Sequence, residues 1–392
     1  MEQKKAMNGA QQRHQQQQRG NLLHLAGVLV FLAALSAPSI GLAVFGYSRD
    51  RHDALEAGAT IRPCNSETLR DGSFVRDLKQ YFSQRFYFRR QLIRLASHVS
   101  LMLGTSFNSD VIPGSGGWLF FGDDAERKCM TGRYPFPEAE LEEWQSFLDE
   151  VQRRAARRGA KFVYFVAPDK HSIYAEELPE SFKAANALAP RLDQIAARLK
   201  TRTAVPFVDP RPALLGAKGQ APLYYKTDTH WNSIGAYVGY SALSDWIAEQ
   251  LHLPRKERWA GYTFGEGTLE GDLGRILGVA AYFTEATPVL RSTGAQGCDL
   301  TDLERRELEI DGGQLTTHCP SAALGKILFF RDSFGTAMAP YLAREAREVN
   351  FLWQALPDLE LIEREQPDLV IFEMVERHLM RPDGWLKGAR PR

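Results

Sequence analysis

Short apolar runs alternate with amphipathic stretches over most of the chain beyond residue 137. Helical spacing, with apolar residues three and four positions apart, recurs in 138–159, 190–202, 234–251, 335–346 and 356–366. Apolar runs typical of buried strands lie at 161–168, 204–210, 325–330, 348–353 and 367–375. This alternation predicts an α/β domain with a mainly parallel sheet and helices on both faces.

Two segments depart from this rhythm. Residues 260–322 are rich in Gly, Thr and polar side chains, which indicates an insertion in a domain spanning 111–392. Residues 47–110 form a polar linker followed by a helical segment, 73–104, with an apolar stripe opposite many Arg and Lys residues. That helix suits either a membrane surface or packing against the domain, and we favour packing.

The N-terminus has the pattern of a membrane anchor. Residues 1–20 are polar and Gln-rich, with four Lys or Arg and a single acid, Glu2, whereas 22–45 carry no formally charged side chain. At about 1.5 Å per residue this run can span a hydrocarbon core of roughly 30 Å. The positive flank predicts a cytoplasmic tail (1–20), a transmembrane signal-anchor (21–46) and a domain on the outer side. A cleaved signal peptide is the alternative, because ALSAPS offers small residues for cleavage, but the apolar run is longer than usual for one.

Charge and cysteine usage narrow the function classes. Lys plus Arg equals Asp plus Glu, at 48 each, so nothing indicates a nucleic-acid partner. The four cysteines contain no C-x-x-C pair, which gives zinc or thioredoxin-like chemistry little support. In an oxidising compartment two disulfides are expected. Of the three possible pairings we predict Cys298–Cys319, closing a short polar insertion, and Cys64–Cys129.

Ser333 is the first candidate for chemistry. In open parallel sheets ligands bind at the carboxyl ends of strands, and RDSFG follows the predicted strand 325–330 directly. A strand, a sharp turn and a helix would place Ser333 at a helix N-terminus, where backbone N–H groups can stabilise an oxyanion. The alternative is that Asp332 or Ser333 only caps the helix.

Asp228 and His230, in TDTHW, offer the base that a nucleophilic serine needs. The carboxylate can accept from one imidazole nitrogen while the other nitrogen faces the serine. Asp-x-His also begins a binuclear metal-site pattern, and Asp169-Lys-His171 is a second example. The Asn-His and Gly-His ligands of that pattern are missing downstream, with only GDLG at 271–274, so we expect no metal. A hydrogen-bonded surface pair without chemistry remains open.

Together these motifs resemble the SGNH hydrolase-like proteins of the alginate O-acetyltransferase type, related to AlgJ and AlgX. The resemblance rests on YYKTDTHWNSIGAY and the later RDSFG, with IPGSGGWLFFGDD, APDKHSIYAEELP and PDLVIFEMVERHL in the same order. It implies an SGNH- or flavodoxin-like three-layer fold and a periplasmic domain held at the bacterial inner membrane. It also implies acetyl transfer to an exported polysaccharide without a cofactor, from a donor supplied by a multi-pass membrane acyltransferase.

The resemblance assigns roles to three residues and leaves others open. Ser333 becomes the nucleophile, His230 the base and Asp228 its orienter. Arg331 stands where ordinary SGNH hydrolases have Gly, and their Gly and Asn oxyanion blocks cannot be located. Auxiliary or substrate-binding candidates are Arg331, Asn232, Trp231, Lys170 and Tyr174. An esterase using the same triad, or a non-catalytic polysaccharide-binding scaffold, remains an alternative function.

Overall fold

The computed structural model describes residues 62–85, 89–183, 189–280, 283–293, 298 and 314–380. The predicted tail (1–20) and signal-anchor (21–46) lie outside these residues. Within the described ranges, no helix combines the length and the apolarity that crossing a bilayer requires. The chain divides into two units, residues 1–96 and 97–392.

Among its described residues, the first unit contains two short helices and the start of a third. These are α2 (Ser66–Arg70), α3 (Ser73–Arg85) and α4 (Arg89–Met102). Asn65 begins α2 because its side chain accepts hydrogen bonds from the backbone N–H groups of Glu67 and Thr68. The last turns of α4 belong to the second unit, where buried Ser97 donates a hydrogen bond to the Leu277 carbonyl at 2.7 Å. This end of the predicted amphipathic segment therefore packs on the domain.

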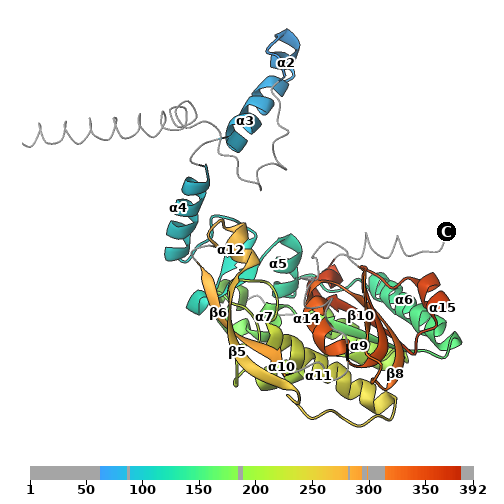
Figure 1. The fold of residues 1–392 in the computed structure, drawn as a ribbon. Coiled ribbons are helices and arrows are strands. Elements are labelled where there is room, and N and C mark those ends of the chain that lie inside the picture. Colours follow the sequence, from blue (N-terminus) through green and yellow to red (C-terminus); the bar gives the residue numbers. More distant parts are fainter. Residues whose placement is uncertain are drawn as a thin grey trace, which may run out of the picture. The chain divides into compact units, whose positions relative to one another are not determined.

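A six-stranded sheet forms the centre of the second unit, with β8 and β10 labelled in Figure 1. Its strand order is β4-β3-β10-β8-β9-β7. Five strands run parallel, and β7 pairs antiparallel with β9 at one edge. The prediction of a mainly parallel sheet is confirmed. The strands are β3 (Lys161–Ala167), β4 (Phe207–Val208), β7 (Leu315–His318), β8 (Leu324–Arg331), β9 (Ala346–Trp353) and β10 (Leu369–Val375).

Successive strand residues point to opposite faces, and each face is covered by helices. In β3, Val163 and Phe165 belong to one hydrophobic cluster, whereas Phe162 and Tyr164 belong to another. The first cluster includes residues of α10 (Arg211–Ala217), α11 (Ser233–Gln250) and α14 (Ser333–Leu342). The second includes residues of α6 (Glu138–Arg157), α9 (Arg191–Arg202) and α15 (Leu359–Glu365). Burial on both faces explains why these strands read as continuous apolar runs.

Two hairpins and several short helices complete the domain. Gly-rich residues link the strands of the antiparallel hairpin β1–β2, and a longer hairpin, β5–β6, flanks α12. The β5–β6 hairpin and α12 lie within the predicted insertion 260–322, but β7, from the same range, is the edge strand of the main sheet. The additional elements are β1 (Val111–Pro113), η1 (Ser115–Gly117), β2 (Leu119–Phe121), α5 (Asp124–Thr131), α7 (Lys170–Ile173), η2 (Ala175–Glu177), α8 (Glu180–Lys183), β5 (Tyr262–Glu270), α12 (Asp272–Ile276), β6 (Thr284–Ser292) and η4 (Glu376–Met380).

Cysteine pairing follows the prediction in one case of two. Cys298 and Cys319 form a disulfide, as expected. Cys64 and Cys129 are both free, so the second predicted pairing is wrong. Cys129 is buried on α5 in the second unit, whereas Cys64 is exposed in the first unit, before α2.

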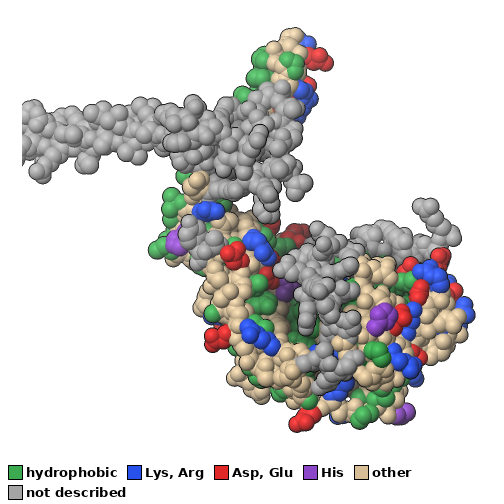
Figure 2. All heavy atoms as spheres, in the orientation of Figure 1, with side chains coloured by type: hydrophobic (Ala, Val, Ile, Leu, Met, Phe, Trp, Pro, Cys, Tyr) green, Lys and Arg blue, Asp and Glu red, His purple; other side chains and the backbone are tan. Residues whose placement is uncertain are grey.

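The domain surface carries charges of both signs. On the face shown in Figure 2, basic and acidic side chains are interspersed, in keeping with the equal numbers of each in the chain.

Candidate active site

Ser333 is the first residue of α14, directly after β8. Asp332 is the N-cap, and its side chain accepts a hydrogen bond from the Phe334 N–H at 2.8 Å. The first N–H groups of a helix have no acceptor within the helix, so the Ser333 N–H takes no part in the helical hydrogen bonds of α14. The turn needs Gly335, because a Cβ there would lie 2.6 Å from a Glu373 carboxylate oxygen and 2.7 Å from the Arg331 Cβ.

His230 and Asp228 meet Ser333 in one continuous hydrogen-bonded chain. The His230 Nε2 lies 2.8 Å from the Ser333 Oγ, and its Nδ1 lies 2.7 Å from the Asp228 Oδ1. Asp228 also accepts from the His230 backbone N–H at 3.0 Å, which fixes the loop between them. The His230 side chain is 29% exposed, so the arrangement is open to a reactant. Nucleophile, base and orienter have the geometry of a Ser-His-Asp triad.

Asp228 is held as an anion. It is 5% exposed, and burial alone would raise its pKa. The hydrogen bond and charge of His230, with backbone N–H donors from His230 and Asp272, outweigh burial and lower the pKa of Asp228 to about 2. A carboxylate that stays ionised can orient the imidazole and stabilise the imidazolium formed during proton transfer.

A second carboxylate, Asp272 at the start of α12, was missed by the sequence analysis. Its oxygens accept from the Thr229 N–H at 2.8 Å and the Thr229 hydroxyl at 2.6 Å, and its own N–H donates to the Asp228 Oδ2 at 2.8 Å. One oxygen lies 3.9 Å from the His230 Nδ1. The preceding Gly271 is required, because a Cβ there would lie 2.0 Å from the Thr227 carbonyl oxygen. The signal was GDLG, which had been considered only as a fragment of a metal motif.

The loop before Asp228 is held from two sides. The carboxylate of Glu285, on β6, accepts from the backbone N–H groups of Lys226 at 2.8 Å and Thr227 at 2.9 Å. On the other side, the buried Lys170 Nζ, at the start of α7, donates to the carbonyls of Tyr225, Lys226 and Asp228 at 3.0, 3.1 and 2.7 Å. The three hydrogen bonds of the Lys170 amine all go to carbonyl oxygens, so Lys170 positions the loop that carries Asp228 and is not free to contact a sugar or an acetyl donor.

Trp231, Asn232 and Tyr174 also serve the architecture around His230. The fully buried Trp231 donates from Nε1 to the Phe334 carbonyl at 3.1 Å, linking the two catalytic turns. Asn232 caps α11 by accepting from two backbone N–H groups at 3.0 Å. The Tyr174 hydroxyl accepts from the Leu223 N–H at 3.0 Å. These contacts give the three side chains positioning roles, in place of the substrate contacts considered for them.

Arg331 is buried as well, at 1% exposure. Its Nη1 donates to the Thr336 hydroxyl at 2.6 Å, and its guanidinium lies 5.1 Å from the centre of the Trp353 ring. Burial lowers the pKa of Arg331, opposed by the neighbouring Glu373 and Asp332. Of the two roles open to Arg331 as an auxiliary residue, binding an anionic polymer or pairing with a neighbouring acid, burial beside Glu373 and Asp332 favours the second.

A metal ion does not suit the ligand atoms of Asp228, His230 and Asp272. Asp228, His230 and Asp272 each offer an atom within 4.8 Å of the others. The His230 Nδ1 is already bound to Asp228, and both Asp272 oxygens accept from Thr229. The contacts therefore favour proton transfer over metal coordination.

Comparison with known proteins agrees with this geometry. Residues 111–298 match the family described as "SGNH hydrolase-like domain, acetyltransferase AlgX". A probable alginate O-acetylase AlgJ of Pseudomonas aeruginosa is 26% identical over 377 residues, covering 89% of this chain and 88% of the relative. The chain is therefore similar to the SGNH hydrolase-like proteins of the AlgJ and AlgX type. A probable alginate O-acetylase AlgJ of Azotobacter vinelandii is 23% identical, with 83% of this chain and 84% of the relative covered.

Solved structures share the SGNH-like fold at lower identity. A DHHW family protein from Eubacterium siraeum has a TM-score of 0.50 and 18% identity, covering 71% of this chain and 94% of the other. Bacillus cereus PatB1, solved with a sulfonyl adduct, has a TM-score of 0.50 and 15% identity, covering 69% and 97%. The predicted family resemblance and α/β fold are confirmed, and these structural likenesses concern the fold alone.

Proposed function

We propose that this protein is a periplasmic O-acetyltransferase, anchored in the inner membrane, that acetylates hydroxyl groups of an exported polysaccharide. The observation that carries the proposal is the hydrogen-bonded chain from Ser333 through His230 to Asp228. The choice of an acetyl group and of a polysaccharide acceptor rests on the relatives named as probable alginate O-acetylases.

In the first half-reaction Ser333 is acetylated. His230 Nε2 takes the Oγ proton as the oxygen attacks the acetyl carbonyl of the donor. The bond between the carbonyl carbon and the donor heteroatom then breaks, and His230 returns the proton to the departing group. Acetyl-Ser333 and a deacetylated donor result.

In the second half-reaction a sugar hydroxyl replaces the donor. His230 accepts the hydroxyl proton while the sugar oxygen attacks the acetyl-serine carbonyl. The bond from this carbon to Ser333 Oγ breaks, and the serine oxygen regains its proton from His230. Asp228 stays ionised throughout and stabilises the imidazolium in both steps.

The oxyanion of each tetrahedral intermediate is placed at the N-terminus of α14. The Ser333 N–H is the donor at this position, and the partial positive charge of the helix start adds to it.

The proposed location of the domain outside the cytoplasmic membrane requires a partner that delivers the acetyl group. A domain outside the cytoplasmic membrane has no direct access to cytoplasmic acetyl donors, so a multi-pass membrane acyltransferase is proposed to deliver the acetyl group. The uncharged run within 21–46, preceded by a basic tail, is proposed to hold the domain beside that partner.

An esterase is the second candidate, because water can replace the sugar in the last step without any change in the triad. The short distance between His230 Nε2 and Ser333 Oγ, 2.8 Å, disfavours a scaffold with a vestigial site.

One experiment separates transfer from hydrolysis. The purified chain is given an activated acetyl ester with uronate and neutral oligosaccharides, and both free acetate and acetylated oligosaccharide are measured by mass spectrometry. Acetylated oligosaccharide in excess of acetate is expected, with an acetylated Ser333 peptide trapped on rapid quenching. Acetate as the sole product would make the protein an esterase.

Variants of the triad test the mechanism. Ser333→Ala and His230→Ala are expected to lower turnover by at least about 10³-fold. Ser241→Ala is the matched control, because that hydroxyl binds only the Tyr237 carbonyl on α11 among its recorded contacts. Full turnover in Ser333→Ala would remove the nucleophile assignment.

Membrane attachment is tested separately. The full chain is expected in the inner-membrane fraction, resistant to alkaline carbonate, with its domain accessible to protease only after the outer membrane is opened. A soluble periplasmic product that has lost residues 1–46 would show a cleaved signal instead.

A further inference from the structure

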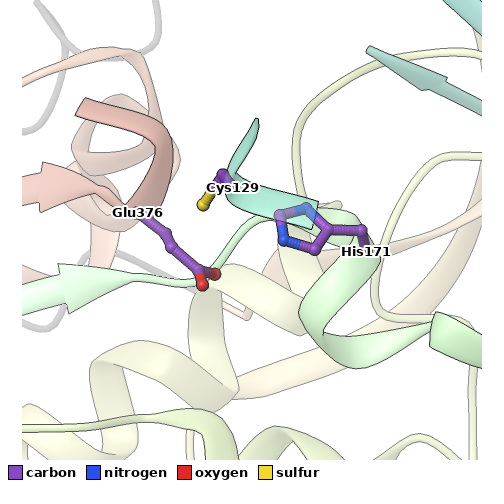
Figure 3. Close-up of side chains that lie close together, drawn as sticks. All are labelled: Cys129, His171 and Glu376. Carbon is purple, nitrogen blue, oxygen red and sulfur yellow. The ribbon is translucent and has the colours of Figure 1, made fainter. Parts of the chain in front are cut away.

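Beside the triad, three buried side chains from distant parts of the chain converge. Cys129 comes from α5, His171 from α7 after β3, and Glu376 from η4 after β10 (Figure 3). The cysteine sulfur, an imidazole nitrogen and a carboxylate oxygen all lie within 4.8 Å of one another. Exposure is 4% for Cys129, 8% for His171 and 0% for Glu376, so water does not solvate these groups freely.

The His171 ring is oriented as in metal sites. Its Nδ1 lies 3.0 Å from a carboxylate oxygen of buried Glu126, which leaves Nε2 for another ligand. A carboxylate on one ring nitrogen and a metal on the other is the usual arrangement around metal-binding histidines. Figure 3 shows the Cys129 side chain, the His171 ring and the Glu376 carboxylate close together, each carried by a different element.

The carboxylates of the cluster are only half satisfied. Glu376 Oε2 accepts from the Asp169 N–H at 3.0 Å and the Ser172 hydroxyl at 2.6 Å. Glu376 Oε1 and Glu126 Oε2 are buried and have no hydrogen-bond partner in the described part of the chain. A buried acceptor of this kind without a partner is costly, and a bound cation removes the cost.

The guanidinium of nearby Arg377 is already paired with the carboxylate of Asp169. Arg377 donates from its backbone N–H to Asp169 Oδ2 at 2.7 Å, and its Nη1 bonds the other oxygen of the same carboxylate. Asp169 therefore has its countercharge in Arg377, whereas Glu376 is influenced by the charges of His171 and Arg211 without a direct hydrogen bond to either among the described residues.

We propose that Cys129 Sγ, His171 Nε2 and Glu376 Oε1 bind a zinc ion. One sulfur, one nitrogen and one carboxylate oxygen match the ligand types of zinc, and a fourth tetrahedral position remains for water. Glu126 is the outer carboxylate that fixes the histidine. Binding draws the three ligand atoms to about 2.0–2.3 Å from the ion and releases the thiol proton.

The ion would be structural and would support the catalytic loop. It ties together α5, α7 and η4, and Lys170, next to His171, holds the backbone of Asp228. Zinc had little support from the sequence pattern because the chain contains no C-x-x-C pair. The three ligands are instead separated by the β3 and β10 crossovers, which bring them together at the carboxyl edge of the sheet.

Metal content of the purified full chain tests the proposal. The protein is loaded with zinc, dialysed against metal-free buffer and analysed by plasma mass spectrometry. About one zinc per chain is expected, with a raised Tm that a chelator reverses. Loading with cobalt is expected to produce a thiolate-to-cobalt absorption band.

Variants identify the ligands. Cys129→Ser and Glu376→Gln are expected to lose the zinc and the cobalt band, whereas Cys64→Ser, which removes the exposed thiol, keeps both. Folded wild-type protein that retains no zinc and shows no change in Tm with zinc would overturn the proposal, whether or not the variants fold. So would Cys129→Ser retaining as much zinc as Cys64→Ser.

Discussion

His230 Nε2 lies 2.8 Å from Ser333 Oγ, although 103 residues separate the two in the chain. A second bond, from Trp231 Nε1 to the Phe334 carbonyl at 3.1 Å, joins the residues that follow each of them. The Trp231–Phe334 bond ties the backbones of the two turns together, which supports the position of His230 relative to Ser333. Such preorganisation is what general-base activation of a serine needs.

Asp228→Asn is expected to lose activity and also the part of the folding free energy that wild type has at neutral pH and loses in acid. The carboxyl pKa is about 2 in the folded protein against an ordinary value of 3.8. A lowered folded pKa stabilises the fold above the unfolded pKa, and this contribution disappears as pH falls from about 4 to about 2. The variant should be about 2 kcal/mol less stable at pH 7, with turnover lowered about 10³–10⁴-fold.

Urea unfolding between pH 7 and pH 2 checks this prediction. The difference in free energy of unfolding between wild type and Asp228→Asn should shrink in the acid range. A difference that stays constant down to pH 2 would show that Asp228 is not the group that titrates.

Asp272→Asn is expected to act through the triad without touching substrate. An amide can accept only one of the two Thr229 hydrogen bonds and removes the charge 3.9 Å from His230 Nδ1. Losing a charge-assisted bond of this kind should lower kcat about 10- to 100-fold with KM unchanged. The exposed Glu270→Gln is the control, and a rise in KM alone would instead place Asp272 in acceptor binding.

Lys170→Met is expected to destabilise the fold and misplace the catalytic loop. It leaves the three carbonyls of Tyr225, Lys226 and Asp228 without their buried donor, which should cost about 3 kcal/mol. Denaturant unfolding measures the loss. Lys200→Met, at an exposed position of α9, should change stability by less than about 0.5 kcal/mol. Equal stability of the two variants would contradict the positioning role.

Removal of the Cys298–Cys319 disulfide is expected to lower stability by about 3 kcal/mol, because the bridge closes a loop with a sequence separation of 21. The double Ala variant and reduced wild-type protein should unfold at the same denaturant concentration. Cys64→Ser should behave like oxidised wild type. Wild-type stability that is unaffected by a reductant would show that the bridge contributes nothing.

Much of the fold was readable from the chain because hydrophobic periodicity is local. Runs such as 161–167 and 369–375 are buried on both faces, so their apolar composition alone identifies parallel central strands. Ser333 and His230 were found by the rule that polar residues after such strands meet at one edge. The carboxylate two positions before His230 belongs to the same local signal.

The residues that hold the loop around Asp228 could not be predicted from local sequence patterns. Asp272 and Glu285 reach the catalytic loop only because α12 and the β5–β6 hairpin fold against it, and Lys170 is a clamp only because its amine is buried under three carbonyls. Hydrogen-bond partners between distant elements leave no periodic pattern in the chain. Local patterns and short motifs in the chain were enough to predict the mainly parallel sheet and the family resemblance, and they pointed to Ser333, His230 and Asp228 as candidates for a triad. The tertiary structure alone decided which side chains face the reactant and which hold the loop, because burial and partner atoms are properties of packing.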